Sequence, residues 1–285
     1  MSVYDVELIT DSTCDIPQEL INQYGIEVLS HFVIWGEEQY RDRVSISPQE
    51  FYERLKTDPR WPTTAAISTP DFVRAFLEAK ARGAKQVMAI LISSAMSRAF
   101  ESAQQAAKEV DIPVHLVDAK GPTMSVGWQV LAAARVREAG GKLADMVAAA
   151  DAVRKRLVQF VLMDSLEYLA RGGRIGNAKR WIGTVLQIKP LVSINHENGL
   201  VEPAATPRTR QRAIETLYQM FFERLDVTRP LHIAVLHGNA LEAAQHLAER
   251  IQNEFHPLEL LINITGPVLG INTGPGALAL CGYNE

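Results

Sequence analysis

Polar side chains that could bind a ligand or act as nucleophiles follow three apolar segments of the sequence. The segments are residues 6–10, 87–92 and 114–117, and the side chains that follow them belong to Asp11, Ser12, Ser93, Ser94 and Asp118. Apolar runs of this length, separated by helix-like stretches, predict the buried strands of a parallel sheet. Ligands of such sheets bind outside the carboxyl ends of the strands, so these five residues are the first candidates for a site.

Serine nucleophiles need a base within hydrogen-bond reach. Ser93 and Ser94 lie outside any GxSxG elbow, and none of the seven histidines lies in a motif that would activate them. A Ser-His-Asp triad can still assemble from distant positions, so an acyl hydrolase that uses Ser93 or Ser94 remains an alternative. Helix capping is the structural alternative for the same hydroxyls.

Glycines and arginines mark other candidate positions. Gly172-Gly173 and the stretch 273–276 could bring backbone N–H groups close to a phosphate, but neither matches GxGxxG or GxxxxGK[ST]. Turns that need positive φ are the favoured interpretation of these glycines. Arg174 follows Gly173, and Arg208 lies at a predicted helix start. Arginines there indicate either an anionic partner or a solvated face.

A metal site is not expected. The acidic residues of the first fifty positions are scattered, and Asp42, between Arg41 and Arg43, is interpreted as part of a solvated charge cluster. Cys14 and Cys281 have no neighbours that would make a CxxC or Cys/His site. We interpret both as free thiols in a reducing compartment.

Composition limits the class of protein. The chain has 285 residues, of which 47% are apolar, and a net charge of -4, which gives no reason to expect nucleic acid as a partner. No apolar run reaches the ~18 residues of a membrane span, and the N-terminus lacks the pattern of a signal peptide. We therefore expect a cytoplasmic protein with no membrane span.

Two α/β domains are predicted, with residues 1–150 forming the first and residues 151–285 the second. Helix signals in the first include Thr69-Pro70-Asp71, where Thr69 is the expected cap. With its strands, this half predicts a parallel, Rossmann-like sheet. The second half contains a hairpin signal at 196–199 and strands that alternate with helices, which predicts a mixed sheet. A helix over 143–157 is expected to bridge the domains.

Seven motifs in order resemble the DegV family, across nearly the whole chain. They are Asp11-Ser12-Thr13-Cys14-Asp15, Ser93-Ser94-Ala95-Met96-Ser97, Val117-Asp118-Ala119-Lys120, Ala170-Arg171-Gly172-Gly173-Arg174, Ile188-Lys189-Pro190, Pro207-Arg208-Thr209-Arg210 and Gly274-Pro275-Gly276. The resemblance implies the EDD fold and one long-chain fatty acid held in a tunnel between the two domains. It further implies a protein that is not an enzyme, has no cofactor, and presents the acyl carboxylate to a fatty acid kinase.

The same resemblance assigns the ligand-binding residues, which are Thr64, Ser68, Ser93, Ser94, Arg174, Arg208, Asn272, Thr273 and Gly274. The family's Thr-Ser-Gln-Pro-Ser loop aligns with residues 64–68, where Thr64 and Ser68 are kept. Its Ser-Gly-Thr-Tyr aligns with residues 97–100, and its histidine before Thr-Gly-Pro-Gly is Asn272 here. Because these differences surround the expected head group, a diverged member that binds another amphiphile is an alternative, beside the acyl hydrolase.

Overall fold

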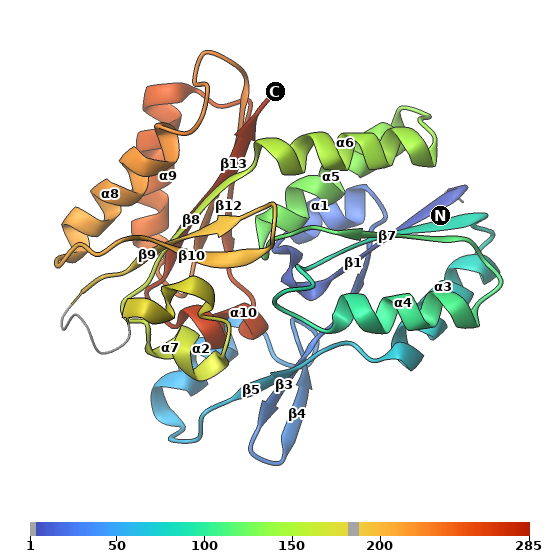
Figure 1. Ribbon diagram of the computed structural model, residues 1–285, viewed down its shortest axis with the longest axis horizontal. Coiled ribbons are helices and arrows are strands. Elements are labelled where there is room, and N and C mark those ends of the chain that lie inside the picture. Colours follow the sequence, from blue (N-terminus) through green and yellow to red (C-terminus); the bar gives the residue numbers. More distant parts are fainter. Residues whose placement is uncertain (1–3, 182–187) are drawn as a thin grey trace.

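The computed structural model describes residues 4–181 and 188–285, and its first sheet is the predicted parallel one. The strand order is β2-β1-β6-β7, with all neighbours parallel. The strands are β1 (Val6–Asp11), β2 (Glu27–Leu29), β6 (Gln86–Leu91) and β7 (Val114–Asp118). The parallel arrangement expected for the first half is therefore confirmed (Figure 1).

Both faces of this sheet are covered, as parallel sheets require. Along β6, Val87 and Ala89 pack in one apolar cluster while Met88 and Ile90 pack in another, which is the two-residue alternation of a strand. The first cluster lies under α3 (Thr69–Ala81) and α4 (Ala99–Glu109), and the second lies under α5 (Met124–Glu138). The 3-10 turn η1 (Ser12–Cys14) and the short α1 (Gln18–Gln23) follow β1.

The cap of α3 is one residue earlier than expected. Ser68, not Thr69, is the N-cap, and its Oγ accepts a hydrogen bond from the backbone N–H of Asp71 at 3.3 Å. The same hydroxyl donates to Asp71 Oδ2 at 2.6 Å. Both hydrogen-bonding functions of Ser68 are thus used within the first turn of the helix.

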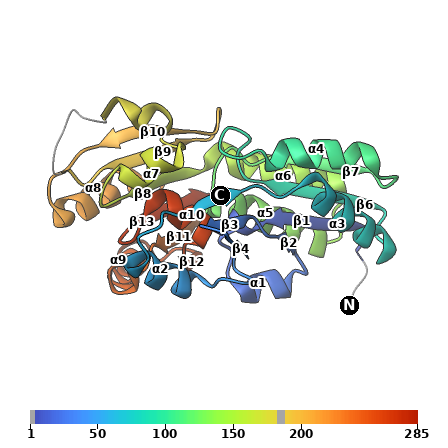
Figure 2. The same cartoon turned by 90° about the horizontal axis from the view of Figure 1, so that it is seen from below.

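The second sheet is mixed, as predicted, with the order β10-β9-β8-β13-β11-β12. Its strands are β8 (Val158–Leu162), β9 (Leu191–Asn195), β10 (Leu200–Ala205), β11 (Leu231–His237), β12 (Glu259–Ile264) and β13 (Leu278–Asn284). Among the described strands of this sheet, only β11 and β12 pair in parallel, and β9 and β10 form the predicted hairpin. α8 (Arg210–Phe222) and α9 (Leu241–Phe255) cover the outer face of this sheet (Figure 2).

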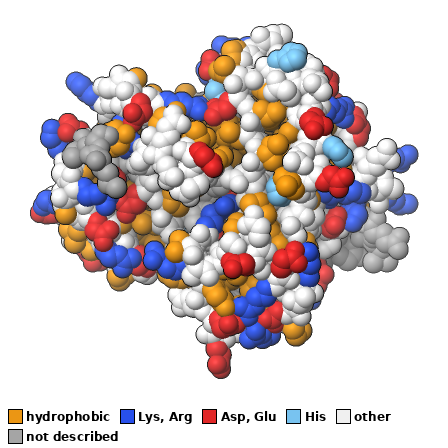
Figure 3. Space-filling view, turned by 180° about the vertical axis from the view of Figure 1, so that it is seen from behind, with side chains coloured by type: hydrophobic (Ala, Val, Ile, Leu, Met, Phe, Trp, Pro, Cys, Tyr) orange, Lys and Arg blue, Asp and Glu red, His pale blue; other side chains and the backbone are white. Residues whose placement is uncertain are grey.

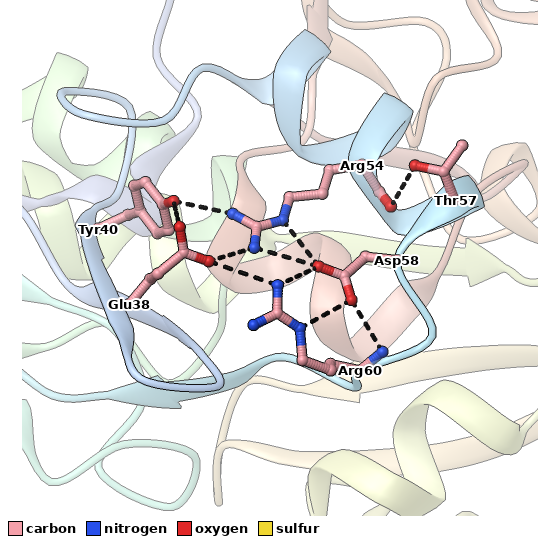
Figure 4. Close-up of polar contacts among 6 residues, drawn as sticks. All are labelled: Glu38, Tyr40, Arg54, Thr57, Asp58 and Arg60. Atoms are coloured by element: carbon pink, nitrogen blue, oxygen red, sulfur yellow. Dashed lines mark hydrogen bonds and ion pairs between the residues drawn. The ribbon is translucent and has the colours of Figure 1, made fainter.

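A third, antiparallel sheet of order β4-β3-β5 was not predicted. It consists of β3 (Phe32–Trp35), β4 (Glu38–Arg41) and β5 (Thr63–Ala65), which are too short for a clear periodicity signal. α2 (Pro48–Thr57) packs beside it, and Arg54 of α2 bonds Glu38, Tyr40 and Asp58, as Figure 4 shows. The guanidinium of Arg54 also stacks 4.4 Å above the ring of Trp35. These contacts attach the small sheet to the helix.

Three short helices and one long one complete the fold. α6 (Leu143–Arg156) packs against α5, and α7 (Glu167–Gly172), η2 (Gly176–Trp181) and α10 (Pro267–Thr273) lie near the second and third sheets. The expected domain boundary at residue 150 falls inside α6, and the largest apolar cluster contains residues of both halves. The division into residues 1–150 and 151–285 stays a prediction.

A buried polar network fastens the turn after β1 to the start of α10. Arg43 forms an ion pair with Asp15 and donates to the carbonyl oxygen of Ile264 at 2.7 Å. Asp15 Oδ1 also accepts from the N–H of Gly266 at 3.1 Å. Because the two halves of the chain contribute to one network, moving one half relative to the other would expose these charges.

Asp42 belongs to the same network, so its interpretation as a solvated residue is wrong. The side chain is 1% exposed. It accepts a hydrogen bond from Ser12 Oγ at 2.7 Å and lies 3.4 Å from the N–H of Val268, which also donates to it. A carboxylate can be buried here because these donors replace water.

Charged side chains of both signs are interspersed over the face shown in Figure 3, with apolar patches between them. Within residues 4–181 and 188–285, no helix has the length and hydropathy to cross a membrane.

Candidate functional site

A cavity of about 250 Å³ lies between the first and second sheets. The first half of the chain contributes Thr13, His31, Thr64, Ala66, Ile92, Met96, Ser97, Arg98, Pro122 and Thr123. The second half contributes Gln159, Val161, Met163, Leu169, Arg174, Val192, Ile194, Val201, Leu236, Thr265, Val268, Leu269, Asn272, Thr273, Ala277, Leu278 and Ala279. The carboxyl end of β6 reaches this cavity through Ile92, as expected for a ligand site on a parallel sheet.

The interior wall is largely apolar. Val161, Val192, Leu236 and Ala279 come from four different strands of the second sheet, and all four belong to the apolar cluster shared with the first sheet. Because alternate residues of a strand face opposite sides, these side chains point toward the first sheet while their neighbours pack under α8 and α9. An apolar chain placed here would be removed from water.

Polar and cationic side chains gather where the cavity wall is partly exposed. They are Thr64, Ser97, Arg98, Arg174, Asn272 and Thr273. Arg174 is exposed, and its guanidinium donates to the carbonyl oxygens of Met96 at 3.1 Å and Gly172 at 2.7 Å. These two bonds hold the side chain in place without neutralising its charge, which favours an anion beside it.

The amide of Asn272 is oriented by its own helix. Nδ2 donates to the carbonyl oxygen of Val268 at 3.0 Å, while Oδ1 is buried and has no hydrogen-bond partner among the described residues. A Cβ atom on Gly172 would lie 2.1 Å from this Oδ1. Gly172 is therefore needed for the close approach of α7 to α10.

A buried carboxylate, that of Asp11, lies beside His31 of the cavity wall. Asp11 accepts hydrogen bonds from Ile92 N at 2.8 Å and from Thr13 Oγ1 at 2.5 Å, and His31 Nε2 lies 3.4 Å from its Oδ1. Burial raises the pKa of Asp11, but the adjacent imidazole of His31 and the hydrogen bonds from Thr13 and Ile92 together lower it below its usual value. Asp11 is thus a fixed anion behind the wall.

Gln159 links the cavity to a second buried group. Its Nε2 donates to Thr123 Oγ1 at 3.0 Å, and its Oε1 accepts from Ser125 Oγ at 2.5 Å. Ser125 Oγ also lies 2.7 Å from His196 Nε2. Burial, with a smaller effect of the Arg154 charge, lowers the pKa of His196 to about 4, so the ring is neutral at pH 7.

Four of the nine residues expected to bind the ligand line the cavity, and five do not. Those that line it are Thr64, Arg174, Asn272 and Thr273. Those that are not part of its lining are Ser68, Ser93, Ser94, Arg208 and Gly274. The ligand-binding role of all nine stays a prediction, but only the first group is positioned to contact an occupant directly.

The remaining five have other surroundings. Ser68 caps α3, and Ser93 Oγ donates to the carbonyl oxygen of Gly199 at 3.0 Å. Arg208 is exposed outside the cavity. Gly274 has a φ of 74°, and a Cβ there would lie 2.5 Å from the ring of Tyr168, so this glycine is explained by the turn and the close packing.

The geometry does not support Ser93 or Ser94 as a nucleophile. Ser94 Oγ donates to Asp118 Oδ2 at 2.5 Å, and within the described residues neither Ser93 nor Ser94 bonds a histidine. Among the residues described, the one serine hydroxyl that bonds a histidine ring is that of Ser125, which is fully buried. No group of three His, Cys, Asp or Glu side chains that could hold a metal occurs within residues 4–181 and 188–285.

Sequence reasoning missed several lining residues. Ser97 replaces Ser93 and Ser94 as the serine of the strand-end loop that reaches the cavity. Its alignment with the serine of the family's Ser-Gly-Thr-Tyr was the signal that could have found it. His31, Gln159 and Thr265 carry no sequence motif, and only the fold brings them together.

The fold and the cavity define an α/β protein whose two main sheets enclose one largely apolar cavity with a polar, cationic opening. Residues 5–285 match the family of uncharacterised proteins called DegV, and the chain therefore belongs to the DegV family.

Relatives are similar along their whole length. A DegV domain-containing protein of Clostridium acetobutylicum is 33% identical, with 98% of each chain covered. A DegV family protein from Thermus thermophilus, described as binding fatty acid, has 31% identity and a TM-score of 0.92, covering 98% of this chain and 99% of that one. The Bacillus subtilis DegV protein, described as a fatty acid binding protein, has 30% identity and a TM-score of 0.90, with both chains fully covered.

Proposed function

We propose that this chain binds a long-chain fatty acid in the cavity between its two main sheets. The observation that carries the proposal is the division of the cavity into an apolar interior and a polar opening with Arg174 beside it. The fatty acid binding described for the similar Thermus thermophilus and Bacillus subtilis proteins supports the same ligand class. Binding of a fatty acid requires no catalytic centre in the protein itself.

The acyl chain supplies the affinity. About 15 methylenes at ~0.8 kcal/mol each give a gross driving force of about 12 kcal/mol, part of which is offset by the entropy lost on binding. The carboxylate cannot be buried unpaired, so it lies at the opening. There the hydroxyls of Thr64 and Ser97 donate hydrogen bonds, and Arg174 supplies the opposite charge.

Native mass spectrometry of gently purified protein tests this proposal. The expected spectrum has a mass increment equal to one long-chain acid, which disappears after delipidation and returns when hexadecanoic or octadecanoic acid is added. Delipidated protein that takes up neither acid would contradict the proposal. Long-chain alcohols and isoprenoids are tested in competition, because an amphiphile without a carboxylate that displaces the acid would support the alternative ligand class.

We further propose that the protein presents the bound carboxylate to a fatty acid kinase. Arg98 and Arg174 are exposed at the opening, and Arg208 is exposed outside it, so a partner can reach the head group and these charges together. The test is acyl phosphate formation by a fatty acid kinase from the same organism, with and without this protein. Arg208→Glu is expected to reduce product formation while leaving fatty acid affinity unchanged. A rate that is independent of the protein would refute the partnership.

A further inference from the structure

His31 is a buried imidazole in the wall of the cavity. It directly precedes β3, is 2% exposed, and contributes to the cavity lining. Its Nε2 lies at ion-pair distance, 3.4 Å, from Asp11 Oδ1 but makes no hydrogen bond among the described residues. Buried polar groups are nearly always paired, so this ring has unused hydrogen-bonding capacity.

Thr265 is a second buried polar residue of the cavity wall whose side chain has no hydrogen-bond partner among the described residues. It follows β12, is 6% exposed, and lines the cavity. Its backbone N–H donates to the carbonyl oxygen of His237 at 2.9 Å, but no described residue bonds its hydroxyl. Thr13 differs from both, because its hydroxyl already donates to Asp11 at 2.5 Å.

These two residues belong to one region of the wall. The backbone carbonyl of His31 accepts from the N–H of Asp42 at 2.9 Å, and Asp42 accepts from the N–H of Val268, three residues beyond Thr265. The buried network that joins the halves of the chain therefore holds both side chains beside the same cavity.

His31 lies inward of the head group rather than beside it. In the antiparallel pair β3–β5, Val33 pairs with Thr64 at the opening. His31 is two residues from Val33, about 7 Å along the strand, and its side chain points to the same face. A carboxylate at the partly exposed opening would therefore leave His31 facing carbons of the acyl chain.

We propose that His31, together with Thr265, binds a hydroxyl group on the acyl chain, so that the preferred ligand is a hydroxy fatty acid rather than a plain one. A methylene at this position would leave the imidazole unpaired, whereas a hydroxyl can both donate and accept. This inference rests on the proposed function, since it specifies which fatty acid the cavity selects.

The test compares octadecanoic acid with its 3-, 6-, 9- and 12-hydroxy derivatives, by calorimetric titration of delipidated protein. At least one hydroxy acid is expected to bind about 10-fold more tightly than octadecanoic acid. His31→Leu should remove this preference, and His31→Gln, which keeps a donor and an acceptor, should retain part of it. His115→Leu changes an exposed histidine outside the cavity and should leave the preference intact.

The other outcomes contradict the inference in distinguishable ways. If octadecanoic acid binds as tightly as every hydroxy acid, the inference fails while the proposed function stands. If His31→Leu weakens all five acids equally, His31 contacts the carboxylate and not the chain. If none of the acids binds wild-type protein, both proposals fail.

Discussion

Ser93 Oγ donates a hydrogen bond to the carbonyl oxygen of Gly199 at 3.0 Å, joining the end of β6 to the β9–β10 hairpin. Ser93 is fully buried, and a Cβ on Gly199 would lie 2.0 Å from its Oγ, so the two segments touch closely. The hydroxyl that the sequence suggests for ligand binding thus links the two halves of the chain.

Ser93→Ala is therefore expected to lower the free energy of unfolding by about 1 kcal/mol, because the buried carbonyl of Gly199 loses its donor. Urea unfolding measures this loss, and fatty acid affinity should change less than about 2-fold. Ser97→Ala provides the comparison and should weaken binding instead. If Ser93→Ala lost fatty acid binding while its stability stayed unchanged, Ser93 would contact the ligand after all.

Arg174→Gln should weaken binding of hexadecanoic acid by about 5–10-fold, because a charge-assisted contact at the opening is lost. The effect should shrink at high salt, where the wild-type ion pair is screened. Arg208→Gln removes an exposed arginine outside the cavity and should leave the affinity unchanged. Equal losses of affinity in both variants would show that the net charge of the protein, and not a local contact of Arg174, affects binding.

Gly172→Ala should disturb the opening through Asn272. The new Cβ would lie 2.1 Å from Asn272 Oδ1, so the amide must move, and we expect weaker binding with a stability loss of about 1 kcal/mol. Thermal unfolding and fatty acid titration measure the two effects. In the Asn272→Ala background the obstacle is absent, so adding Gly172→Ala should then have little further effect.

His196 should make stability depend on pH. Its pKa is near 6.5 in the unfolded chain and about 4 in the fold, so the folded state resists protonation. Its contribution is present above pH 6.5 and is lost as the pH falls toward 4, amounting to about 3 kcal/mol. Urea unfolding between pH 4 and 7.5 should show a smaller pH dependence in His196→Gln than in wild type. The exposed control His115→Gln should behave as wild type does.

Arg43→Met should lower stability by about 3 kcal/mol, because it leaves Asp15 buried without its counter-charge. Burial already raises the pKa of Asp15 to about 6 despite the opposing effect of Arg43. Adding Asp15→Asn should recover part of the loss, since an amide carries no charge. No recovery in the double variant would mean that Arg43 acts through its bond to Ile264 alone.

Strong local patterns made much of the fold predictable. The helix predicted over 143–157 forms as α6 (Leu143–Arg156), and the hairpin at Asn198-Gly199 forms as its turn residues indicate. The strands β3, β4 and β5 were missed because three or four residues are too few to show a period. β13 was missed because Leu278–Tyr283 is buried on both faces and shows no alternation.

The cavity could be located only in part. Strand-end residues pointed to the correct edge of the first sheet, but Val161, Val192 and Leu278 cannot be told from core residues by their type. The distinction between Ser93 and Ser97 depends on where the loop after β6 turns. The burial of Asp42 could not be predicted from the sequence either, because it depends on partners that are far away in the chain.

The position of β13 also determines when the cavity can form. This strand lies between β8 and β11, and its Leu278 pairs with Leu162. Contacts of such large sequence separation form slowly, because a long loop must close before they stabilise anything. The first sheet pairs segments closer in sequence and can fold earlier. Since Leu278 and Ala279 line the cavity, we expect a late folding step to complete its wall, and only then can a ligand be retained.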